Sequence, residues 1–77
     1  MLNIDIEKYS RYKKVIHVLI NECKTSIRLE FTKSTICEYL QTLALNDMLT
    51  ADEYNRLRQY VSEEYLRRIF EDVWYWI

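Results

Sequence analysis

The sequence predicts an all-α domain of three main helices, the last of which is long and runs to the C-terminal end. The 77 residues include no Gly and no Pro. The tight turns of sandwiches and barrels need positive φ, which Gly usually supplies, so these folds are disfavoured. Hydrophobic residues make up 49% of the chain, which is enough for a core and argues against disorder. A chain of this length forms a single domain, residues 1–77, close to the lower size limit for independent stability.

The first predicted helix covers residues 5–24, where apolar residues recur at steps of three and four positions. These residues are Tyr9, Tyr12, Ile16, Leu19, Ile20 and Cys23. A β-hairpin over residues 15–31 competes with this helix, because Ile27, Leu29 and Phe31 alternate with polar residues. The hairpin would make the fold α+β. We prefer the helix, because its pattern is longer and a tight hairpin without Gly is disfavoured.

The second predicted helix covers residues 36–45 and follows a bend or short loop at residues 25–26. Thr35 is expected to be its N-cap, and Glu38 three residues later would complete a capping box. Its inner face consists of Ile36, Leu40, Leu43 and Ala44. We expect the helix to end at Asn46–Asp47, because Asn tolerates the left-handed conformation that ends helices.

The third predicted helix begins after Thr50, with Glu53 at the capping-box position and Asp52 at the positive end of the helix. Its apolar positions cover well over half of the circumference, more than the stripe that one surface helix usually carries. One face continues from Leu57 and is expected to meet the second helix. The residues predicted to bind a partner are Leu66, Phe70, Trp74, Trp76 and Ile77, since aromatic side chains are enriched at interface cores. The alternative is that helices of the same chain cover these residues.

The acidic residues of the third helix resemble a catalytic pair at first sight. However, Glu63 and Glu64 each have an Arg four residues later and a further acid four residues beyond it. Such ladders support an exposed helix. The acidic residues with fewer cations nearby are Asp47, Asp52 and Glu53, and these are the ones that we expect to contact a basic partner.

Several classes of function lack the residues that they need. A chain without Gly has no Gly-rich phosphate loop. His17 stands alone on a polar stripe, where a metal site would need further ligands at short spacing, so we expect no metal, no cofactor and no enzymatic activity. Cys23 and Cys37 are expected to be reduced thiols in the core. No apolar run approaches the roughly 20 residues that span a bilayer, and no signal-peptide pattern is present, so we expect a cytoplasmic protein without a membrane partner.

Residues 36–60 resemble the helical hairpin of short C-terminal (SHOCT-like) domains, which small phage and conjugative-element proteins carry. The residues that carry the resemblance are Leu40, Leu43, Asn46, Asp47, Leu49, Thr50, Glu53 and Tyr54. The sequence departs from that pattern at Asp47, where the family has Gly. The resemblance implies a role in interaction or oligomerisation.

The expected function is therefore that of a small helical interaction protein, a phage or mobile-element accessory that inhibits or regulates a larger host protein such as a nuclease or transcription factor. We expect a protein partner and a homodimer or larger assembly. The weaker alternative is a helix-turn-helix DNA-binding regulator, although a net charge of −1 lacks the basic footprint of such domains. The residues that would then contact nucleic acid are Lys13, Lys14, Lys24, Arg28, Asn55, Arg58 and Gln59.

Overall fold

The computed structural model describes residues 4–72 and contains three helices over that range: α1 (Ile6–Asn21), α2 (Ser26–Leu45) and α3 (Ala51–Asp72). The predicted all-α fold is confirmed. The alternative hairpin over residues 15–31 is wrong, because this stretch contributes the second half of α1 and the beginning of α2, and the described part of the chain contains no strand.

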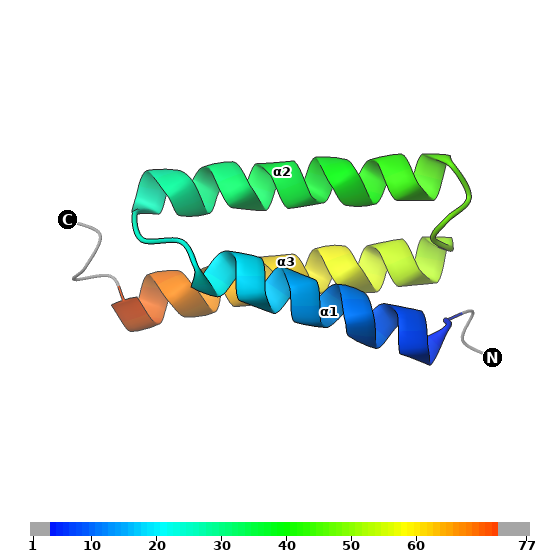
Figure 1. Cartoon of the computed structure of the whole chain (residues 1–77), viewed down its shortest axis with the longest axis horizontal. Helices are drawn as coiled ribbons and strands as arrows, with labels where there is room; N and C mark the ends of the chain where they lie inside the picture. The colour runs from blue at the N-terminus through cyan, green and yellow to red at the C-terminus, as the bar shows by residue number, and fades with distance from the viewer. Residues whose placement is uncertain (1–3, 73–77) are drawn as a thin grey trace.

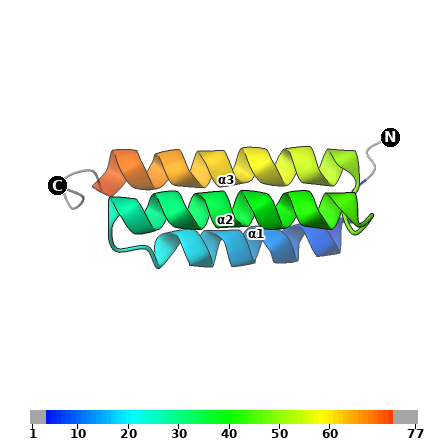
Figure 2. The same ribbon diagram turned by 90° about the horizontal axis from the view of Figure 1, so that it is seen from above.

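The helices form an up-down-up bundle in which each helix runs antiparallel to the one before it (Figure 1). Seen from above, α2 lies over the other two, and α3 and α1 lie on either side of it (Figure 2). The helix α3 packs against both other helices more extensively than these pack against each other. The buried core consists of Ile16, Ile20, Cys23, Leu29, Ile36, Leu40, Leu43, Leu49, Leu57 and Val61.

The helix α1 begins after Asp5, whose side chain caps it by accepting a 3.1 Å hydrogen bond from the backbone N–H of Lys8. It ends at Asn21, three residues before the predicted end. The last carbonyls of a helix need donors from outside the helix. Here the guanidinium of Arg68 donates to the carbonyl of Asn21 at 3.1 Å and to that of Cys23 at 2.9 Å. The end of α1 is thus hydrogen-bonded to a side chain of α3.

The helix α2 begins ten residues before its predicted start. Its N-cap is Thr25, whose hydroxyl accepts a 3.1 Å hydrogen bond from the backbone N–H of Arg28. The predicted capping box at Thr35 and Glu38 is wrong, since both residues lie inside the helix. The prediction missed the first turns because Ile27 and Phe31 suggested an alternating strand. In the structure both side chains are exposed, whereas Leu29 is fully buried.

The turn between α2 and α3 lies at the predicted residues, but Asn46 does not take the left-handed conformation expected of it, since its φ is −98°. Asn46 caps the end of α2, and Asp47 takes the left-handed conformation with φ of 60°. The capping box at the start of α3 is present. The backbone N–H of Glu53 donates to the Thr50 hydroxyl at 3.1 Å, and the backbone N–H of Thr50 donates to the Glu53 carboxylate at 2.9 Å. The predicted extension of this helix over residues 73–77 lies outside the described residues.

Candidate interaction surfaces

Glu53 belongs to the interior of the protein and does not contact a partner as predicted. Its side chain is 1% exposed and joins three segments. The carboxylate accepts a 2.8 Å hydrogen bond from the backbone N–H of Asp5 and lies 3.0 Å from the ammonium of Lys8, in addition to its bond with Thr50. Burial raises the pKa of this carboxyl, but the hydrogen bonds from Thr50, Asp5 and Lys8 outweigh it and lower the pKa to about 2. Of the three predicted acidic contacts, Asp47 and Asp52 have exposed side chains.

A polar network links α1 to α3 near the opposite end of the bundle. His17 contacts the carboxylate of Glu64 through Nδ1 and the amide of Asn21 through Nε2, the latter at 2.7 Å. Arg67 donates to Glu64 at 2.9 Å and to Asn21 Oδ1 at 2.8 Å. The hydrogen bond from Arg67, with that from His17, lowers the pKa of the Glu64 carboxyl in spite of burial. His17 is exposed on the polar side of α1, as expected, and it also contacts Glu64 and Asn21.

The predicted charge ladders are present only in part. Arg67 pairs with Glu71 at 3.1 Å, which is one of the predicted contacts four residues apart. Glu63, however, accepts a hydrogen bond from Gln59 at 3.3 Å. Glu64 is largely buried and pairs with Arg67 and His17, so it serves the contact between helices and not the exposed surface.

The outer face of α3 carries two of the predicted partner-binding residues. Leu66 is 49% exposed and Phe70 is 78% exposed. Both lie on the side of the helix opposite Leu57 and Val61, which are fully buried. The remaining predicted anchors, Trp74, Trp76 and Ile77, lie outside the described residues. The separation of α3 into a core face and an exposed apolar face thus holds as far as the structure describes it.

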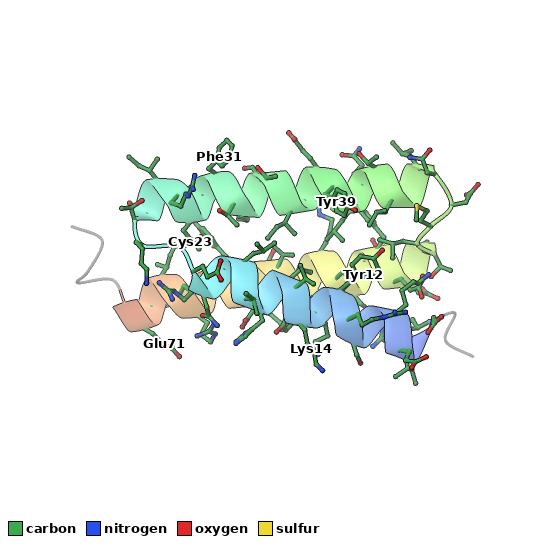
Figure 3. All side chains as sticks on the ribbon, viewed as in Figure 1. Tyr12, Lys14, Cys23, Phe31, Tyr39 and Glu71 are labelled. Carbon is green, nitrogen blue, oxygen red and sulfur yellow. The ribbon has the colours of Figure 1, made fainter. Side chains whose placement is uncertain are left out.

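A second apolar surface lies between α1 and α2 and was not predicted. It surrounds a pocket of about 340 Å³ lined by Leu19, Glu22, Cys23, Arg28, Phe31, Thr32, Thr35 and Ile36, which we name the α1–α2 groove. Figure 3 shows Cys23 between the end of α1 and α2, and Phe31 at the same end of the bundle, on the side of α2 that points away from α1. Leu19 is 41% exposed and Phe31 is 64% exposed.

The sequence does hold a signal for this groove. Leu19 was assigned to the inner face of the first helix, but α1 and α2 do not pack closely enough to cover it. Residues 15–20 have only one polar side chain, so they carry more apolar surface than one inner face accommodates. The exposure of Val15 and Val18 follows from the same excess. This excess of apolar residues, like the one on α3, indicates a surface that one helix face cannot bury.

The residues of the nucleic-acid alternative are spread over three elements. Lys13 and Lys14 lie on α1, where the ammonium of Lys13 stands 4.8 Å from the centroid of the Tyr60 ring. Lys24 and Arg28 lie at the connection to α2 and in its first turn. The others, Asn55, Arg58 and Gln59, lie on α3. DNA-binding helix-turn-helix motifs have two helices that cross at a large angle, whereas α2 and α3 run antiparallel side by side (Figures 1 and 2).

Residues 4–72 contain no group of three or more His, Cys, Asp or Glu side chains that could hold a metal ion. Cys23 is buried, Cys37 is half-buried, and both are free thiols. Among the described residues, none of the helices has the length and the apolar character needed to cross a membrane.

Comparison of the chain with protein-family models, with curated proteins and with solved structures found no match.

Proposed function

We propose that this chain is a non-enzymatic protein–protein interaction module that binds a helix of a partner protein in the α1–α2 groove. The observation that carries the proposal is the exposure of Leu19 and Phe31 at the edges of that pocket. An amphipathic helix that lies in a groove between two helices is a common mode of recognition. It would bury these side chains as the fourth helix of a bundle does.

The composition of the groove fits this occupant. Its floor includes the buried residues Cys23 and Ile36, and its edges carry the charged residues Glu22 and Arg28. An apolar centre with a polar rim is typical of interfaces. The hydroxyls of Thr32 and Thr35 could hydrogen-bond to polar groups at the edge of the incoming helix.

We propose further that the outer face of α3 joins two copies of the chain. Leu66 and Phe70 form an exposed apolar pair four residues apart on one helix. In the sequence, Trp74 and Ile77 follow Phe70 at steps of four and three residues. A self-complementary helix face of this kind suits a twofold dimer, in which the same residues of both copies meet.

The biological role that we propose is that of a cytoplasmic phage or mobile-element accessory protein that inhibits or regulates a larger host protein, such as a nuclease or transcription factor. The small size of the domain supports this role, as does the resemblance of residues 36–60 to SHOCT-like hairpins. A compact surface with an apolar groove can block a larger protein without any chemistry of its own.

The test uses the tagged protein as bait in a bacterial lysate. Phe31→Lys places a charge at the edge of the groove, whereas Phe70→Lys places the same charge on the outer face of α3. We expect the wild type and Phe70→Lys to capture the same partner and Phe31→Lys to bind it at least about 30-fold more weakly, the effect of losing one interface anchor. Circular dichroism of both variants checks that each one folds.

Sedimentation of the same proteins at micromolar concentration tests the second surface. Phe70→Lys should reduce self-association, and Phe31→Lys should leave it unchanged. Equal capture by all three proteins, with the wild type monomeric, would contradict both assignments. Retention of random duplex DNA by the wild type, lost when the salt concentration is raised moderately, would favour the nucleic-acid alternative.

A further inference from the structure

The amide of Asn21 lies between His17 and Arg67 and contacts both. Its Nδ2 is 2.7 Å from His17 Nε2, and its Oδ1 accepts a 2.8 Å hydrogen bond from Arg67 Nη2. On the other side of the ring, His17 Nδ1 meets the carboxylate of Glu64. These contacts lie between α1 and α3, away from the α1–α2 groove, and do not depend on the proposed function.

The chemistry of the donors determines where the imidazole proton lies. A guanidinium can only donate, so Asn21 must turn its oxygen towards Arg67. The NH₂ group of Asn21 therefore faces His17 Nε2, which has to be the bare, accepting nitrogen. The neutral ring then carries its proton on Nδ1 and donates it to Glu64. In this state every contact of the network pairs a donor with an acceptor.

We propose that His17 and Asn21 form a proton-operated switch that transfers the link between α1 and α3 from the Arg67–Asn21 hydrogen bond to a His17–Glu64 ion pair. When solvent supplies a proton to Nε2, an N–H bond forms there and faces the NH₂ group of Asn21. Two donors then oppose each other. Turning the amide over gives the imidazolium an oxygen to bind, but it also turns the NH₂ group towards Arg67, which loses its acceptor on α1.

The contacts that remain after the switch are already present in the structure. The imidazolium keeps its bond to Glu64, which becomes an ion pair between two charged groups and is therefore stronger. Arg67 keeps Glu64 at 2.9 Å and Glu71 at 3.1 Å, both on its own helix. Arg67 thus changes from a residue that bridges two helices to one that contacts α3 only.

The charged groups around the ring act in opposite directions. Three residues of α3 face the ring: Glu64, Arg67 and Tyr60. The negative charge of Glu64 favours the protonated ring, and the positive charge of Arg67 opposes protonation. On α1, Lys13 and Lys14 line the same shallow pocket of about 550 Å³ as His17 and also oppose protonation. The side chain of His17 is 48% exposed, so solvent can exchange its proton.

Nuclear magnetic resonance of the ¹⁵N-labelled full chain tests the switch. At pH 8, long-range ¹H–¹⁵N correlations of His17 should show the proton on Nδ1. As the pH is lowered, the side-chain signals of Asn21 and Arg67 should shift with the same midpoint as those of the His17 ring. A neutral ring with its proton on Nε2, or a His17 titration to which Asn21 and Arg67 do not respond, would overturn the proposal.

Two variants provide the matched controls. In Asn21→Asp the carboxylate accepts from both Arg67 and the imidazolium, so the midpoint of His17 should rise by at least about one pH unit and Arg67 should no longer respond to pH. In His17→Gln the response of Asn21 over pH 5–8 should disappear while the helical circular dichroism remains. If the Arg67 signal of His17→Gln still shifted over this range, a group other than His17 would control it and the proposal would fail.

Discussion

The backbone N–H of Asp5 donates a 2.8 Å hydrogen bond to Oε2 of Glu53, 48 residues further along the chain. The other carboxylate oxygen of Glu53 accepts from the backbone N–H of Thr50 at 2.9 Å and lies 3.0 Å from the ammonium of Lys8. One buried side chain thus satisfies the N-terminal ends of two helices, α1 and α3. We expect the stability of this end of the bundle to depend on Glu53.

Glu53→Gln should destabilise the protein by roughly 1–3 kcal/mol. The amide offers one acceptor in place of two, so either the N–H of Asp5 or that of Thr50 loses its buried partner, and Lys8 loses its counter-ion. Urea unfolding followed by circular dichroism gives the free energy of unfolding. Asp52→Asn in the same helical turn is the control, and it should cost no more than about 1 kcal/mol because this side chain is exposed at the positive end of the helix dipole. An equal loss of unfolding free energy in both variants would mean that the buried contacts of Glu53 do not contribute to stability.

The contribution of Glu53 should disappear in acid. The pKa of Glu53 is about 2 in the folded protein, against an ordinary value of 4.5. A carboxyl whose pKa is lower in the folded state stabilises the protein fully above the unfolded value and loses this effect as the pH falls through the folded value. The free-energy difference between wild type and Glu53→Gln should therefore shrink by up to about 3 kcal/mol between pH 5 and pH 2. Urea unfolding across this range measures it, and a difference that does not change with pH would exclude a lowered pKa.

Leu57→Ala and Phe70→Ala separate the two faces of α3. Leu57 is fully buried, so its truncation should cost on the order of 2–5 kcal/mol of stability. Phe70 is 78% exposed, so its truncation should change stability by no more than about 0.5 kcal/mol. It should instead weaken self-association, which sedimentation measures. A large loss of stability for Phe70→Ala with unchanged association would place this side chain in the core and remove the proposed dimer surface.

Asp47→Gly and Asp47→Val test the left-handed turn. A residue with a Cβ atom pays about 1–2 kcal/mol for this conformation, less for Asp than for most others, and a β-branched residue is an outlier there. We expect Asp47→Gly to leave the melting temperature unchanged or raise it by a few degrees. We expect Asp47→Val to lower it, by about 4–8 °C for each kcal/mol lost in a domain of this size. Similar melting temperatures for the two variants would show that φ at this position does not limit stability.

The features that could be predicted from the sequence are those that depend on contacts between residues close together in the chain. The capping box of Thr50 and Glu53 spans three residues, and α2 ends at Asn46–Asp47 as expected, although the left-handed residue is Asp47. The core of α2 also follows from the 3.6-residue period, since Ile36 and Leu40 are both buried as expected. Local signals of this kind require no knowledge of the other helices.

Features could not be predicted where a local pattern fitted two structures or where the contact joins residues far apart in the sequence. Thr25 and Thr35 are both acceptable helix caps by type, and only the burial of Leu29 ahead of Ile36 shows that the helix continues through Thr35. The position of Glu53 in a capping box does not reveal that Asp5 also binds it. The apolar excess of residues 15–20 indicates an uncovered surface, but which of these residues stays exposed depends on how closely α1 and α2 pack.

The contacts of Arg68 affect when the chain can fold during its synthesis. Its guanidinium donates to the carbonyls of Asn21 and Cys23, so the end of α1 gains these two hydrogen bonds only once α3 is in place. The ribosome releases α1 and α2 first, before Leu57 and Val61 exist to complete their core. We therefore expect the nascent chain to remain open to chaperones and proteases until α3 emerges, and then to fold as one unit.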